Sequence, residues 1–220
     1  MGIFEYPKIN TIWKRESEKP CRIILGAYSR PEFETVNRWH VTEKIDGTNV
    51  RVIWDGDKVE FRGRTDRAEM PTKLMLHLQQ TLTPEKLASK FSGPVILFGE
   101  GYGAGIQKGG GNYSKDQKFV LFEILIDGWW LEPCNVQDIA ASLEVPVVPN
   151  LGTMETQEAI DIIEHPDWNL GSFSKLAETP QTKIEGIVCR SVPDLFNRRG
   201  ERAMWKLKVK DYAALGPHHA

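Results

Sequence analysis

A lysine placed just before an Asp-Gly turn is the first group that suggests chemistry. Lys44 lies two residues before Asp46-Gly47 in the stretch VTEKIDGTNVRV. A free lysine has a pKa of about 10.4, so at neutral pH it is mostly protonated and a poor nucleophile. Nearby cations disfavour the ammonium form. Lys206 and Lys208 are two residues apart on an expected strand and therefore point to one face, from which they would activate Lys44 and neutralise a phosphate group.

The lysine motif alone is weak, because such a short pattern arises by chance in roughly a few per cent of chains this long. Further blocks follow it in order, each on or beside an expected strand: Arg64-Thr65, Phe98-Gly99-Glu100, Phe119 to Glu123, Glu185 to Val188, and Lys206 to Lys208.

In this order the blocks resemble motifs I, Ia, III, IIIa, IV and V of the covalent nucleotidyltransferase superfamily, which comprises ATP-dependent RNA and DNA ligases and mRNA capping enzymes. The match runs from Glu43 to Lys208. It is strongest with the RNA ligase 2-like branch, because the Lys44 motif continues through Thr48 to Asn49. The resemblance implies an α+β fold with mainly antiparallel sheets and flanking helices, the nucleotidyltransferase (ATP-grasp-like) domain of nucleic-acid ligases.

The resemblance also implies a reaction. The lysine attacks the α-phosphate of ATP, pyrophosphate leaves, and a lysyl-AMP phosphoramide remains. AMP then passes to the 5′-phosphate of a nucleic acid, and a 3′-hydroxyl displaces it to seal the strand. In such phosphoryl transfers, positioning and charge neutralisation supply most of the catalysis.

Roles transfer to individual positions through the same resemblance. Lys44 is the nucleophile, Gly47 permits the tight turn that exposes it, and Asn49 is tied to the sealing step. The residues implied to bind the nucleotide are Glu43 at the adenine amino group, Ile45 beside the nucleophile, Arg64 near the ribose and phosphate, Glu100 at the ribose hydroxyl, Phe122 stacked on the purine, Glu185, and the α-phosphate pair Lys206 and Lys208.

A divalent metal is implied as well. Carboxylates near a triphosphate require a cation between them, and Mg²⁺ typically bridges phosphates with one or two carboxylates. The resemblance gives Glu185 and Glu100 as the expected metal ligands, with Mn²⁺ as an alternative to Mg²⁺.

Several residues keep a plainer interpretation open. Arg62 and Arg67 compete with Arg64, and alternation along the strand cannot separate Arg62 from Arg64. Phe122 also fits an ordinary core position. Other plain interpretations concern larger sets: a charged sheet edge at Lys206, Lys208 and Lys210, a flexible loop at Gly103 to Gly111, packing at Trp129-Trp130, and structural histidines at His40 and His77.

Composition limits the class of protein. The chain has 220 residues, 40% hydrophobic and 26% charged, which suits a globular protein with a real core. The 3 cysteines are widely spaced, fit a reducing cytoplasm, and predict neither disulfides nor a zinc site. No membrane-spanning run or signal peptide is seen. The net charge of −2 means that nucleic acid must be held by local basic patches, for which the candidates are Arg198, Arg199, Arg202, Lys206, Lys208 and Lys210.

Hydrophobic periodicity predicts the elements that must position these residues. The expected strands are 40–43, 48–54, 59–65, 94–99, 118–126, 129–132, 183–190 and 203–210, and the expected helices are 72–81, 84–91, 135–143 and 156–165. Hairpin-like runs with interspersed helices indicate an α+β protein rather than a βαβ repeat.

The domain prediction is a single adenylyltransferase domain over residues 1–212 with a flexible tail at 213–220 and no OB-fold or other C-terminal domain. The expected partners are RNA with 5′-phosphate and 3′-hydroxyl ends and a protein that supplies such a module. No membrane contact is expected. The predicted function is an ATP-dependent RNA ligase. Its expected location is the bacterial cytoplasm, or the host cytoplasm if a phage encodes it. The alternatives are a minimal DNA ligase or guanylyltransferase, or a non-catalytic nucleotide-binding relic of the fold.

Overall fold

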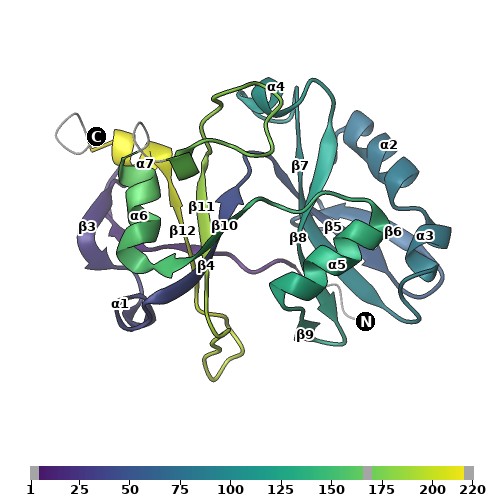
Figure 1. The fold of residues 1–220 in the computed structure, drawn as a ribbon, viewed down its shortest axis with the longest axis horizontal. Helices are drawn as coiled ribbons and strands as arrows, with labels where there is room; N and C mark the ends of the chain where they lie inside the picture. Colours follow the sequence, from purple (N-terminus) through teal and green to yellow (C-terminus); the bar gives the residue numbers. More distant parts are fainter. Residues whose placement is uncertain (1–4, 166–169, 216–220) are drawn as a thin grey trace. The chain divides into compact units, whose positions relative to one another are not determined.

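The structure is a computed structural model that describes residues 5–165 and 170–215 (Figure 1). This part of the chain forms two compact units. Unit 1 comprises residues 5–7, Asp46–Val148 and Ala177–Pro180, and unit 2 comprises Lys8–Ile45, the described part of Pro149–Leu176, and residues 181–215. Of the expected tail, residues 216–220 lie outside the described residues. The assignment of residues 1–212 to a single adenylyltransferase domain stays a prediction.

Unit 1 is built on an antiparallel sheet in the strand order β6-β5-β7-β8-β9. Its strands are β5 (Thr48–Trp54), β6 (Val59–Gly63), β7 (Val95–Tyr102), β8 (Lys118–Ile126) and β9 (Trp129–Trp130). Its helices are α2 (Thr72–Thr81), α3 (Pro84–Ala88), α4 (Gly110–Tyr113) and α5 (Pro133–Leu143), all visible in Figure 1.

Helices α2, α3 and α5 of unit 1 cover one face of this sheet. Apolar residues of α2, α3 and α5 pack in one core with alternate residues of the strands, such as Val50, Val52 and Trp54 of β5. Because successive strand residues point to opposite faces, Asn49 and Arg51 point to the other face. That second face carries a smaller apolar cluster around Phe98.

Unit 2 is built on a sheet in the order β1-β12-β11-β4-β10. Only β1 and β12 run parallel among these described pairs. The strands are β1 (Asn10–Thr11), β4 (Arg38–Lys44), β10 (Asn150–Glu155), β11 (Gly186–Ser191) and β12 (Met204–Lys208), with a separate pair β2 (Trp13–Arg15) and β3 (Ile23–Tyr28). The helices are α1 (Pro31–Thr35), α6 (Thr156–Glu164), α7 (Val209–Ala213) and the 3₁₀ turn η1 (Leu170–Ser172).

Helix α6 provides the cover for one face of the unit 2 sheet. Ile160 and Ile163 of α6 pack in one core with Trp39 and Val41 of β4 and Trp205 of β12. Alternation then places Thr42 and Lys44 of β4 on the face opposite α6, which agrees with their partial exposure.

The predicted α+β class with mainly antiparallel sheets is confirmed. The strand 48–54 and the helix 72–81 are found with the predicted bounds. The predicted strand 203–210 is wrong at its end, because β12 stops at Lys208 and Lys210 lies in α7. There the Val209 amide donates to the Glu185 carbonyl at 3.0 Å, and the chain turns into a helix that buries Asp211 and Tyr212.

No helix within residues 5–165 and 170–215 is long and apolar enough to cross a membrane.

Candidate active site

A row of three residues across the unit 2 sheet places two lysines side by side. Lys44, the last residue of β4, is paired with Gly186 of β11, and Gly186 is paired on its other side with Lys208 of β12. Because Gly186 has no side chain, nothing in the row separates the two lysine side chains. The prediction that Lys208 shares a face with Lys44 therefore holds within this sheet.

The glycine in this row is required by close packing. A Cβ atom added to Gly186 would lie 2.1 Å from the Leu207 carbonyl oxygen and 2.8 Å from the Lys208 Cα atom, both in β12. Any side chain at this position would therefore push β12 away from β11. The row explains why a glycine follows Glu185 in the sequence.

Gly186→Ala is expected to destabilise the protein by about 1–3 kcal/mol, because overpacking against a neighbouring backbone carries that cost. The matched control is Gly93→Ala, since a Cβ atom at Gly93 would meet nothing within 4 Å. Chemical denaturation of both variants measures the difference. Equal stability of the two variants would contradict the close packing of β11 on β12 in the solution state.

Glu185 lies between the two lysines and forms an ion pair with each. The Lys44 Nζ atom is 2.5 Å from Glu185 Oε2, and the Lys208 ammonium bonds to the other carboxylate oxygen. The side chains are largely buried, with exposed fractions of 21% for both lysines and 13% for Glu185. Burial raises the pKa of Glu185, but the charge of Lys44 and the hydrogen bonds from Lys208 and Lys44 outweigh it, so the pKa lies below its ordinary value.

Lys206 belongs to the next row on the same face. It is paired with Val188, which is paired in turn with Thr42 of β4. The face opposite α6 thus carries Lys44, Lys206 and Lys208, together with the Glu185 carboxylate. Three ammonium groups on one face, two of them paired with one ionised carboxylate, are suited to bind the oxygens of a polyphosphate.

Glu43 and Ile45 flank Lys44 but are not part of this exposed face. Glu43 is 1% exposed, points to the α6 side, and accepts a hydrogen bond from the Lys175 amide at 3.3 Å. Ile45 is 3% exposed, and its carbonyl oxygen lies 3.4 Å from Lys44 Nζ. The nucleotide-binding roles of both residues stay predictions.

Unit 1 brings a second set of predicted residues together. Asn49 of β5 is paired directly with Glu100 of β7, and both lie on the face opposite the helices. The Asn49 Oδ1 atom is buried and has no hydrogen-bond partner among the described residues. A buried acceptor without a donor costs about 1–3 kcal/mol, so this oxygen fits a ligand or water that supplies one.

Phe122 lies on the same face, at a β-bulge in β8 that leaves it without a partner residue in β7. Its ring packs edge-on against Tyr6, with the ring centroids 5.1 Å apart. The Tyr6 hydroxyl donates to the buried Glu123 carboxylate at 2.7 Å. Phe122 is therefore partly a core residue, and its stacking on a purine stays a prediction.

The structure separates the arginines that periodicity leaves equivalent. Arg62 is paired with Glu60 and Asp66, at 2.7 and 3.2 Å, whereas Arg64 follows the end of β6, is exposed, and has no ion pair with a described residue. The structure therefore removes Arg62 as a rival, whereas Arg67 is exposed like Arg64 and the choice between these two stays a prediction.

Arg51 is a residue that the sequence analysis missed. Its guanidinium is completely buried, and it donates to the Gly63 carbonyl and to Asp66, each at 2.8 Å. These bonds hold both ends of the short segment that carries Arg64. The sequence did contain a signal for this role, because Arg51 is a lone arginine in an apolar strand and a buried charge requires partners.

The turn after Lys44 is also supported from the glycine-rich loop. The Gln107 side chain donates to the Gly47 carbonyl at 3.0 Å. A Cβ atom at Gly47 would lie 2.2 Å from the Gly101 carbonyl oxygen, so this glycine is needed for close approach of two backbones. The loop at Gly103 to Gly111, whose interpretation as a flexible loop stays a prediction, contributes this contact to the lysine motif.

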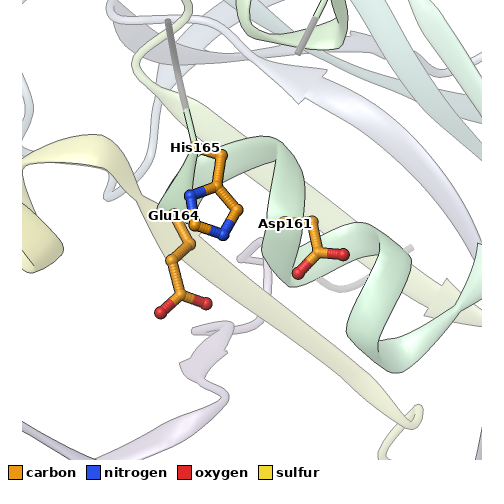
Figure 2. A group of neighbouring side chains, drawn as sticks. All are labelled: Asp161, Glu164 and His165. Carbon is orange, nitrogen blue, oxygen red and sulfur yellow. The ribbon is translucent and has the colours of Figure 1, made fainter. Parts of the chain in front are cut away.

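One group of metal-ligand side chains gathers elsewhere in the described chain. Asp161, Glu164 and His165 lie at the end of α6, with ligand atoms within 4.8 Å of one another (Figure 2). Burial raises the pKa of Tyr212 to about 12; the hydrogen bond with Trp13 opposes this rise, and the charges of Glu164 and Asp161 add to it. The group does not include Glu185 or Glu100, whose metal-binding role stays a prediction.

Comparisons with known proteins agree with this arrangement. The model of the family described as RNA ligase matches residues 37–208. No curated protein matches the sequence. Among solved structures, a mutant of Naegleria gruberi RNA ligase with AMP and Mn has a TM-score of 0.64 at 20% identity, covering 96% of this chain and 60% of that chain.

Two further Naegleria gruberi structures give similar values. A mutant of the RNA ligase with ATP and Mn has a TM-score of 0.64 at 19% identity, covering 94% of this chain and 60% of that one. The same ligase with PPi has a TM-score of 0.63 at 22% identity, covering 96% and 63%. At these identities the likeness establishes a common fold, and the chain spans about 60% of the length of the structures it matches.

Proposed function

Because the chain belongs to the RNA ligase family, we propose that it is an ATP-dependent RNA ligase whose nucleophile is Lys44. The observation that carries this proposal is the row Lys44–Gly186–Lys208 with the Glu185 carboxylate between the two lysines. A relic that only bound nucleotides would not need an amine held in this way. The Naegleria gruberi relatives that were solved with ATP or AMP and Mn support the same reading.

In the proposed first step, a bond forms between Lys44 Nζ and the α-phosphorus of ATP. The bond from that phosphorus to the bridging oxygen breaks, pyrophosphate leaves with the electron pair, and the lysine proton passes to solvent. Lys208 and Lys206, on the same face of the sheet, neutralise charge on the α-phosphate. Because Glu185 pairs with Lys44, the amine must leave this ion pair before it attacks.

The later steps use RNA. The phosphate–nitrogen bond breaks as AMP moves to a 5′-phosphate, and a 3′-hydroxyl then attacks that phosphate and releases AMP. We assign Asn49 to this sealing step, and Arg64, Glu100 and Phe122 to the nucleotide, as the family resemblance implies. The unpartnered Asn49 oxygen supports a ligand contact at that position.

The residues present suit a divalent metal. The depressed pKa keeps Glu185 ionised, and hard cations such as Mg²⁺ and Mn²⁺ prefer carboxylate oxygens. Glu185 would hold the ion, and Glu100 is the second acid proposed to do so. The ion supplies charge neutralisation for the triphosphate. The proposal places this chemistry in a cytoplasm, bacterial or host.

Labelled nucleotides test the function directly. The protein is incubated with Mg²⁺ and with ATP or GTP labelled on the α-phosphate, denatured, and separated by electrophoresis. We expect label from ATP and none from GTP, because the family resemblance is to the ATP-dependent branch. Label from GTP only would favour a guanylyltransferase, and no label from either nucleotide would favour the non-catalytic relic.

Nicked duplexes then identify the polynucleotide. We expect sealing of a nick with RNA on the 3′-hydroxyl side, because the 2′-hydroxyl is the group that distinguishes RNA from DNA. Sealing of DNA nicks at an equal rate would favour a DNA ligase. The same assay without added protein partners tests whether this chain seals RNA by itself.

A further inference from the structure

The hairpin that joins β11 to β12, residues 192–203, is closed by hydrogen bonds among its own residues. Figure 1 shows it extending beyond the ends of these two strands. Backbone bonds join Asn197 to Glu201 at 2.9 Å and Ala203 to Leu195 at 2.9 Å. The Asn197 side chain also accepts bonds from the Arg199 and Glu201 amides, at 2.9 and 3.0 Å. The tight turn therefore fixes the positions of Arg198 and Arg199 at its tip.

This hairpin has apolar side chains that no described residue covers. Val192 is 41% exposed, Leu195 42% and Phe196 53%. They make up half of the large hydrophobic residues that are exposed in the described chain, and they fall within five consecutive positions. A cluster of this kind beside polar residues marks a contact surface more often than a random scatter does.

The charge that the hairpin presents is positive. The two acidic residues of the hairpin already form ion pairs, Glu201 with Arg30 at 3.1 Å and Asp194 with Arg190 at 3.4 Å. Arg198 makes no hydrogen bond or ion pair with any residue in 5–165 or 170–215. An exposed aromatic ring and exposed guanidinium groups in one short hairpin are the combination that binds a nucleobase and its phosphate together.

We propose that this hairpin is a docking surface for the RNA strand, with Phe196 stacked on an unpaired base and Arg198 and Arg199 on phosphates. The inference rests on the proposed function, since an RNA ligase must hold RNA as well as ATP. A lipid surface is a poorer occupant, because membrane-binding clusters typically contain about 4–8 basic residues.

The hairpin lies at the far end of β11 from the proposed nucleophile. Lys44 pairs with Gly186, the first residue of β11, whereas the hairpin follows Ser191, the last. Five strand steps separate these residues, a distance of about 17 Å. The adenylylation of Lys44 and the binding of RNA by the hairpin are therefore separable measurements.

The test measures binding of a fluorescein-labelled single-stranded RNA with a 5′-phosphate, by fluorescence anisotropy over a range of salt concentrations. Removing the ring in Phe196→Ala should weaken binding roughly 5- to 150-fold at every salt concentration, the range expected for one base stack, while Phe196→Tyr restores it. Trp129→Ala, which removes an aromatic ring with 77% exposure elsewhere, is the matched control and should leave binding unchanged.

Removing the charges in the double variant Arg198→Ala/Arg199→Ala should reduce the slope of log affinity against log salt by about 1–2, because each phosphate contact contributes about 0.7 for a single strand. The control Lys73→Ala/Lys90→Ala removes two exposed cations from unit 1 and should preserve the slope.

Three outcomes decide the inference. Loss of RNA affinity in the hairpin variants, with normal labelling of Lys44 by ATP, supports it. Unchanged RNA affinity in these variants overturns it, and leaves the proposed function intact if Lys44 is still labelled. Binding of the wild type to phosphatidylserine vesicles that the variants lose, without a change in RNA affinity, also overturns it, in favour of a membrane contact.

Discussion

Lys44→Ala is expected to abolish covalent labelling of the protein by α-labelled ATP, with a reduction of roughly 10³-fold or more. The reason is that the variant has no amine at the end of β4 to form the phosphoramide, whereas Lys206 and Lys208 lie on β12 and would be held on the phosphate. Electrophoresis of the denatured protein after incubation with ATP and Mg²⁺ measures the loss.

The control for this prediction is Lys44→Arg, which keeps a positive charge and its pairing with Glu185 but offers no nucleophilic amine. It should remain folded and unlabelled. If Lys44→Ala retained labelling within a few-fold of wild type, another residue would be the nucleophile, and the role given to the Lys44–Gly186–Lys208 row would be wrong.

Lys208→Ala is expected to slow labelling by roughly 10²–10³-fold, the usual effect of removing one preorganised group that stabilises charge in a transition state. Lys208 pairs with Glu185 and lies beside Lys44 across Gly186. Single-turnover labelling at saturating ATP separates this effect on the chemical step from an effect on ATP binding.

Lys210→Ala is the matched control for Lys208, because it lies two residues further along but belongs to α7 and not to β12. The labelling rate of this variant should stay within about twofold of the wild-type rate, because an exposed lysine away from the row contributes little to charge stabilisation. Equal losses of labelling rate in Lys208→Ala and Lys210→Ala would mean that nearby positive charge alone explains the rate, and that the Lys44–Gly186–Lys208 row has no special role.

Local patterns predicted much of this fold. The alternation in Thr48–Trp54 and the helical period of Thr72–Thr81 appear directly in the sequence, and both elements have the predicted bounds. Alternation also placed Lys206 and Lys208 on one face, and the sheet confirms it. The strands β1 and β2 were missed, because elements of two or three residues carry too little periodicity to detect. The six-residue strands β3 and β10 were missed as well, and length does not explain these two.

The arrangement of the site could not be predicted from local sequence patterns. Lys44 and Glu185 are 141 positions apart, and their ion pair depends on the register between β4 and β11, which no local pattern encodes. The same holds for Asn49 and Glu100, which are neighbours only through the pairing of β5 with β7. The end of β12 before Lys210 depends on Val209 bonding to the Glu185 carbonyl, which is again a long-range contact.

Peptide mapping is the most direct test of the central claim. The wild-type protein is incubated with ATP and Mg²⁺, digested under conditions that preserve phosphoramides, and analysed by mass spectrometry. We predict one AMP per chain, attached to the Nζ atom of Lys44. An adduct on any other residue, or an unmodified Lys44 in a folded protein that has consumed ATP, would contradict the account.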